Sequence, residues 1–357
     1  MDEDKSSQIE EQNSTQIVNT ILQEIEKDRE KEIISRRFGL FDRKETLEQI
    51  GEMLSITRER VRQLEKSIFT KLINNPKIIN SDNFKNFENQ LVTLIKKEGG
   101  VVTVNHLALL TNQNKLDKTE RSRLSFICLL STQMNLLEEN DSYFQALSLK
   151  ENFSNNKELI TLIDNIVEII KQANHPCTLK ELTTLLKNND QKTLNSVASV
   201  SKKLASLNNT WGLIKWPTVN PKNIRDKIYV ILKENGKQMH FNDIADSIKK
   251  SGFKRKDVTT QAIHNELIKD KRFVLVGRGI YALKEWGYKQ GTVADVITSI
   301  LKEAGKPLHR DEIVKRVLKD RFVKETTILL NLQAKKDFKR FSKATYGLRE
   351  EQSSLSK

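Results

Sequence analysis

The chain has 357 residues, of which 30 % are charged and 6 % aromatic, and its formal net charge at pH 7 is +14. No apolar run reaches the roughly 20 residues that span a bilayer. Only Cys128 and Cys177 are present and neither has a CxxC partner, which argues against a disulfide framework or a zinc site. Scarce glycine and proline favour helices with short polar connections, and the excess of positive charge points to a polyanionic partner.

The charge is unevenly distributed along the chain. Residues 1–30 hold nine acidic and three basic side chains, a net of −6, whereas residues 219–357 hold 31 basic and 17 acidic side chains, a net of +14. We expect residues 1–15 to be a disordered acidic tail and residues 351–357 a second tail. The polar N-terminus is unlike a signal or transit peptide, so we expect a cytoplasmic, nucleoid-associated protein. A solvated lysine-rich surface is the alternative reading of the basic half.

Residues 16–75 carry the pattern of a small helical domain. An apolar stripe predicts one helix that runs to about Arg37 and ends at Gly39; it consists of Ile17, Ile21, Ile25, Ile33 and Ile34. Thr46, with Gln49 three residues later, predicts a capped short helix. Thr57 predicts the cap of the next helix, which follows after a tight turn. Two short helices joined in this way are the helix-turn-helix plan.

The outer face at the start of the second of these helices is rich in side chains that can read base edges. Arginine recognises guanine, glutamine adenine, and glutamate the amino group of cytosine. The N-terminal turn of a recognition helix is the part that reaches the bases in the major groove. We therefore expect DNA contact from Thr57, Arg58, Glu59, Arg60, Arg62, Gln63 and Lys66.

Three sequence runs closely resemble region 4 of the sigma-70 family, over about residues 20–73. They are RRFGL at 36–40, TLEQIGE at 46–52 and ITRERVRQLE at 56–65. The resemblance implies binding to the −35 promoter element through Arg58, Glu59, Arg62 and Gln63, with Arg60 on a phosphate or a base edge. It also implies docking on RNA polymerase core through a surface that includes Ile33, Ile34, Phe38 and Leu40. Two departures are the run KSIFT at 66–70, where the family commonly has AKALR, and the missing promoter-melting region upstream. We therefore expect that the chain cannot open a promoter as a sigma factor does.

The rest of the chain shows an internal repeat. Segments starting at residues 97, 171, 233 and 302 each read as a helix ending in Lys-x-x-Gly or a variant, then a short strand and a second helix. Each is followed by a closing strand. The fold class we expect is mainly α: a helix-turn-helix followed by a tandem array of small winged-helix units. The units span 84–150, 157–217, 221–289 and 291–350, the first two being degenerate and the second having a weak hairpin.

The last two units resemble the HARE-type helix-turn-helix family and the N-terminal domain of the delta subunit of bacterial RNA polymerase. The residues that carry the resemblance are MHFNDIA at 239–245, LHRDEI at 308–313, and DKRF at 270–273 with YALKEW at 281–286. The resemblance implies contact with nucleic acid or polymerase without choosing between them. His240 and His309 stand at equivalent positions, where we expect packed or capping histidines rather than metal ligands.

Basic side chains gather near the hairpins of these two units. Arg278, between two glycines, is expected to reach a phosphate or a minor groove from a hairpin tip. Phosphate contact and a solvated surface are both open for the other clusters, which are Lys249, Lys250, Lys254, Arg255 and Lys256, and Lys335, Lys336, Lys339, Arg340 and Lys343.

The sequence carries no enzyme signature, and we expect no cofactor, metal, small-molecule substrate or membrane partner. Three functions remain open: a regulator that reads promoter DNA, a polymerase accessory subunit that competes with sigma, and a general nucleoid-binding array. The third gives the residues of the recognition helix no role. The expected partners are double-stranded promoter DNA and RNA polymerase core.

Overall fold

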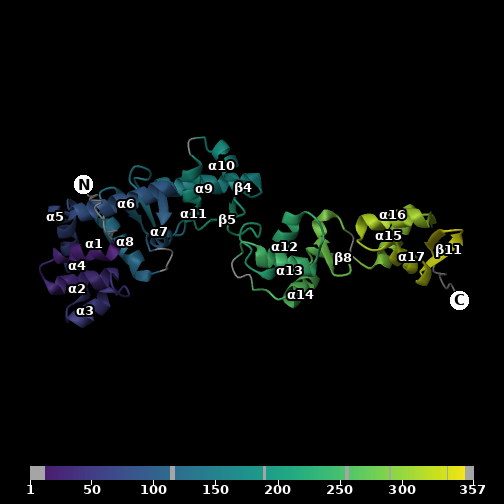
Figure 1. Cartoon of the computed structure of the whole chain (residues 1–357), viewed down its shortest axis with the longest axis horizontal. Helices are drawn as coiled ribbons and strands as arrows, with labels where there is room; N and C mark the ends of the chain where they lie inside the picture. Colours follow the sequence, from purple (N-terminus) through teal and green to yellow (C-terminus); the bar gives the residue numbers. More distant parts are fainter. Residues whose placement is uncertain are drawn as a thin grey trace, which may run out of the picture. The chain divides into compact units, whose positions relative to one another are not determined.

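The fold was established from a computed structural model, which describes residues 13–112, 117–187, 190–253, 257–288, 291–335 and 337–349. The chain divides into two compact units, Met1–Ile214 and Lys215–Lys357. The described residues are mainly helical and include four small three-stranded antiparallel sheets (Figure 1). The expected mainly α class agrees with this. Most of the expected acidic tail, the tail at 351–357, Lys336, and the cluster Lys254, Arg255 and Lys256 lie outside the described residues.

The first unit begins with five helices in place of the single long helix and helix pair expected from the sequence. They are α1 (Ser14–Gln23), α2 (Asp28–Phe38), α3 (Leu47–Leu54), α4 (Arg58–Ile73) and α5 (Pro76–Ile79). The prediction of one helix to Arg37 is wrong, and Ser14 belongs to a helix rather than to a tail. The isoleucine stripe serves two different cores: α1 packs on α6 and α8, whereas Ile33 of α2 packs against α3 and α4. The chain must turn between them, and Lys27 adopts an extended conformation there.

The helix-turn-helix itself forms as its capping residues predict. Thr46 and Gln49 form a capping box on α3, and the Thr57 hydroxyl accepts the backbone N–H of Arg60 at 3.2 Å. The turn between α3 and α4 passes through Ser55 in the left-handed region, at φ 53°. Gly51 permits this turn, because a Cβ at that position would lie 2.7 Å from the carbonyl oxygen of Ile56.

The order helix, strand, helix, helix, strand, strand then occurs four times among the described residues, and we call these segments repeats 1 to 4. Repeat 1 comprises α6 (Asp82–Glu98), β1 (Val101–Thr103), α7 (Val104–Thr111), α8 (Lys118–Leu130), β2 (Met134–Leu137) and β3 (Ala146–Leu149). Repeat 2 comprises α9 (Asn156–Ala173), β4 (Cys177–Thr178), α10 (Leu179–Leu185), α11 (Gln191–Val200), β5 (Leu204–Leu207) and β6 (Thr210–Leu213).

The second unit holds the other two repeats. Repeat 3 comprises α12 (Ile224–Asn235), β7 (Met239–His240), α13 (Phe241–Lys250), α14 (Thr260–Lys269), β8 (Phe273–Gly277) and β9 (Ile280–Leu283), followed by the 3-10 helix η1 (Lys284–Trp286). Repeat 4 comprises α15 (Val293–Ala304), β10 (Leu308–His309), α16 (Arg310–Asp320), α17 (Glu325–Ala334), β11 (Phe338–Ser342) and β12 (Thr345–Leu348). In every repeat the last strand lies between the other two.

The repeated Lys-x-x-Gly motif is the end of the first helix in each repeat. The residue after that helix is left-handed in all four, at Gly99, Asn174, Gly236 and Gly305. This conformation ends a helix and returns the chain along it, which is why the motif marks the period of the array.

Two hairpins differ from the expectation. The closing strand of repeat 1 is Ala146–Leu149, three residues later than expected, while Tyr143 bridges to Ser201 of repeat 2. The hairpin of repeat 2, expected to be weak, is paired from Leu204 with Leu213 to Leu207 with Thr210. Its two-residue turn, Asn208 and Asn209, has positive φ at both positions, the geometry that matches the twist of the flanking strands.

Candidate nucleic-acid interface

The residues expected to contact DNA lie on the exposed part of one helix, α4. Val61, Ile68 and Leu72 turn inward and are buried, so the remaining faces of the helix are free of packing. The structure brings together and exposes all seven residues that the sequence selects: Thr57, Arg58, Glu59, Arg60, Arg62, Gln63 and Lys66. Thr57 caps the N-terminus of the helix, the end whose dipole favours a phosphate.

Polar side chains on this face are hydrogen-bonded to one another. Arg62 donates to both carboxylate oxygens of Glu59, from Nε at 2.8 Å and from Nη2 at 2.7 Å. Gln63 donates to Glu59 at 3.5 Å and accepts from Arg60 at 3.4 Å. The Arg62 hydrogen bonds hold the pKa of Glu59 below its ordinary value and raise that of Arg62. Both groups are therefore ionised, and because solvent-exposed pairs contribute little to stability, Arg62 can exchange Glu59 for another acceptor.

Helix α2 holds the helix-turn-helix from beneath. Ile33, Ile50 and Val61 form its small core, each with no exposed surface. Arg29 donates to the carbonyl of Leu54 at 2.6 Å and so satisfies the C-terminal end of α3. On the far side, Arg37 pairs with Glu65 of α4 at 3.1 Å.

The four residues expected to contact polymerase are not arranged as a free surface. Ile33, Ile34 and Leu40 have no exposed surface, and Phe38 is half-buried. The Phe38 ring lies 5.0 Å from that of Phe126 in α8. The expectation that these side chains face a partner needs correction, because the chain's own α8 and the helical core already contact them.

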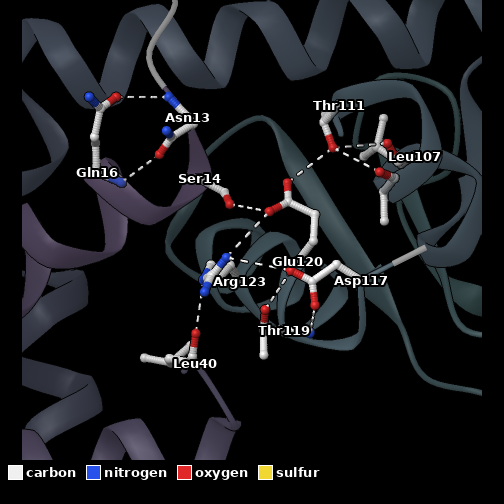
Figure 2. A network of polar contacts seen from close by, with 11 residues as sticks. Asn13, Ser14, Gln16, Leu40, Leu107, Thr111, Asp117, Thr119, Glu120 and Arg123 are labelled. Atoms are coloured by element: carbon white, nitrogen blue, oxygen red, sulfur yellow. Dashed lines mark hydrogen bonds and ion pairs between the residues drawn. The ribbon is translucent and has the colours of Figure 1, made fainter. Parts of the chain in front are cut away.

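A polar network fixes the helix-turn-helix to repeat 1, and Figure 2 shows it. Glu120 of α8 accepts a hydrogen bond from the hydroxyl of Ser14 in α1 and another, at 3.0 Å, from Thr111 of α7. Arg123 lies 3.7 Å from the Glu120 carboxylate and donates from Nε to the carbonyl of Leu40 at 2.8 Å. Sequence reasoning missed this network because Ser14 and Glu120 are 106 residues apart and no local pattern links them.

The hairpin tip of repeat 3 carries Arg278, which is exposed as expected. Repeat 4 places Lys343 at the equivalent position, immediately after β11 and before a residue of positive φ, Ala344. His240 and His309 cap α13 and α16 through Nδ1, which confirms the capping interpretation. Within the described ranges, no group of histidine, cysteine and acidic side chains could hold a metal ion. The described helices also include none that is long and apolar enough to cross a membrane.

Comparison with known proteins supports the location of this interface. Residues 27–73 match the family of sigma-70, region 4, a DNA-binding domain of transcription. Over 47 residues the chain is 57 % identical to RNA polymerase sigma factor sigB of Arabidopsis thaliana and 55 % identical to RNA polymerase sigma factor RpoD of Helicobacter pylori. These alignments cover 13 % of this chain but only 8 % and 7 % of the two relatives. The similarity therefore concerns the helix-turn-helix, not the whole of a sigma factor.

Proposed function

We propose that this protein is a DNA-binding transcription protein that reads a −35-like promoter element through α4. The observation that carries the proposal is the exposed, capped and polar N-terminal half of α4, in a segment that matches sigma-70 region 4. We assign no catalytic activity to it, and we place it in the cytoplasm on the nucleoid.

Base recognition in this proposal requires an exchange of partners on α4. Arg62 leaves Glu59 and donates its two N–H groups to a guanine, and Glu59 then accepts from the amino group of a cytosine. Gln63 and Arg58 complete the base contacts. Arg60 and Lys66, on the flanks of the helix, meet the phosphates together with the capped N-terminus at Thr57.

For the four repeats we propose winged-helix domains, of the HARE type in repeats 3 and 4, that contact DNA or RNA polymerase. The element order and the central position of the last strand in each sheet support this assignment. Because Ile33, Ile34 and Leu40 are buried, a polymerase contact would have to use other side chains, so we favour the role of promoter reader over that of an accessory subunit.

The test is binding of the full chain to fluorescent duplexes, measured by anisotropy. One duplex carries a −35-like element and the other has the same bases in scrambled order. We expect Arg62→Ala to weaken binding to the first duplex by about tenfold or more and to leave binding to the second nearly unchanged. Lys77→Ala, which removes an exposed cation from α5, is the matched control. Equal losses on the two duplexes would replace base reading with phosphate contact.

A further inference from the structure

The second unit contains a cavity of about 1030 Å³ between repeats 3 and 4. Its walls are the β8–β9 hairpin, the N-terminal end of α15, and the segment that leaves α16 and enters α17. The walls are held together by a hydrogen bond of 2.8 Å from the N–H of Phe322 to the carbonyl of Val276. Gly277 allows this approach, because a Cβ there would overlap the carbonyl oxygen of Phe322. The volume is at the upper end of what small-molecule sites use.

The cavity walls are apolar and open to solvent. Leu275 is 49 % exposed, Leu318 41 % and Phe322 58 %, and all three line this cavity. Exposed large apolar side chains that gather around a hollow mark a binding surface more often than scattered ones do.

The charged groups around the cavity are all positive. Arg278, Arg321 and Lys324 line it, and the described lining residues include no acid. The nearest acidic influences on Arg321 are Asp320 and Asp295. The Asp295 carboxylate is already bound, since it accepts from the N–H and the hydroxyl of Thr292 at 2.6 and 2.8 Å.

Arg321 is the buried part of this charge, with only 4 % of its surface exposed. Its guanidinium donates to the carbonyls of Leu275 and Gly291, but among the described residues its Nε has no hydrogen-bond partner and no carboxylate forms an ion pair with it. A buried cation without a counter-charge is unfavourable, and an anion in the adjoining cavity would offset that cost.

We propose that this cavity binds a small amphipathic organic anion, with its apolar body against Leu275, Leu318 and Phe322 and its acidic group toward Arg321 and Lys324. A small molecule fits the volume, and the cations in an otherwise apolar lining select an acid over a neutral compound. This inference is independent of promoter reading by α4.

The test titrates the full chain with 1-anilinonaphthalene-8-sulfonate, an apolar anion that fluoresces in apolar sites, and with the neutral N-phenyl-1-naphthylamine. We expect the sulfonate to bind at least tenfold more tightly, and decanoate to displace it where decanol and inorganic phosphate do not. Lys324→Gln and Leu318→Asn should each weaken sulfonate binding by about tenfold. Lys306→Gln, beyond the other end of α15, and Leu330→Asn, an exposed leucine of α17, are the matched controls and should bind as the wild type does.

Three results would overturn the proposal. One is equal binding by the two cavity variants and the wild type, both cavity side chains being exposed enough that the variants should fold. Another is equal affinity for the neutral probe, which would remove the role of the cations. The last is displacement by inorganic phosphate at the concentration at which decanoate acts, which would show a site for bare anions.

Discussion

The ring of Phe38 on α2 lies 5.0 Å from the ring of Phe126 on α8, and Phe69 of α4 completes the group at 5.9 Å from Phe38 and 6.5 Å from Phe126. The helix-turn-helix and repeat 1 therefore share a core, which runs without interruption from Ile17 to Leu149. Because α4 contributes to that core, its exposed face is held in a fixed orientation on repeat 1. A fragment that ended near residue 75 would leave Phe38 and Phe69 without their partner.

Truncation of Phe126 tests this coupling. Phe126 has no exposed surface, and Phe126→Ala should lower the free energy of unfolding of the first unit by about 3–5 kcal/mol. Urea denaturation of the full chain, followed by circular dichroism, measures the change. Phe144→Ala, in the same unit but with its ring 42 % exposed, is the control and should cost less than about 1 kcal/mol. Similar costs for the two variants would mean that α2 and α4 do not depend on repeat 1.

The turn of the helix-turn-helix gives a second prediction. Gly51→Ala places a methyl group 2.7 Å from the carbonyl oxygen of Ile56, so the turn must shift, and we expect a loss of about 1–3 kcal/mol in unfolding free energy. Gly252→Ala is the matched control, since nothing lies within 4 Å of its Cβ position and its φ is not positive. Urea titrations of the two variants in parallel decide the matter, and a Gly51 variant as stable as the control would contradict the steric argument.

What the sequence predicts well is local chemistry. The caps at Thr46 and Thr57 form as expected, because a hydroxyl three residues before a free backbone N–H is a short-range arrangement. The helix break near Lys27 was missed, because an isoleucine every four residues looks the same whether the stripe meets one core or two. The burial of Ile33, Ile34 and Leu40 could not be inferred either, because it depends on α8, more than 70 residues later.

Glu59 gives a prediction about specificity and pH. Glu59→Gln removes a negative charge from the DNA-facing side of α4 and loosens Arg62, so binding to the scrambled duplex should tighten and the preference for the −35-like duplex should fall. In the wild type the pKa of Glu59 is lowered, so the carboxylate stays charged above its ordinary value of 4.5 and is neutralised only at more acidic pH. Anisotropy titrations at pH 5 and pH 7 should therefore show the same preference for the wild type. A preference that disappears at pH 5 would indicate that another group titrates.

The hairpin tips of repeats 3 and 4 supply the last prediction. Arg278 and Lys343 are exposed, each directly follows the first strand of its hairpin, and each precedes a residue of positive φ. Side chains at such tips have no packing role, so Arg278→Ala combined with Lys343→Ala should leave the fold intact. If both tips meet phosphates, the slope of log affinity against log salt for full-chain binding to duplex DNA should become shallower by about two contacts, at roughly 0.9 per phosphate.

The control is the pair Lys222→Ala and Lys306→Ala, two exposed lysines outside the hairpins that change the net charge by the same amount. A general effect of net charge would shift both double variants alike, whereas phosphate contact at the tips predicts a change in slope for the tip variant alone. An unchanged slope in the tip variant, with full circular dichroism, would assign these hairpins to protein rather than to DNA contact.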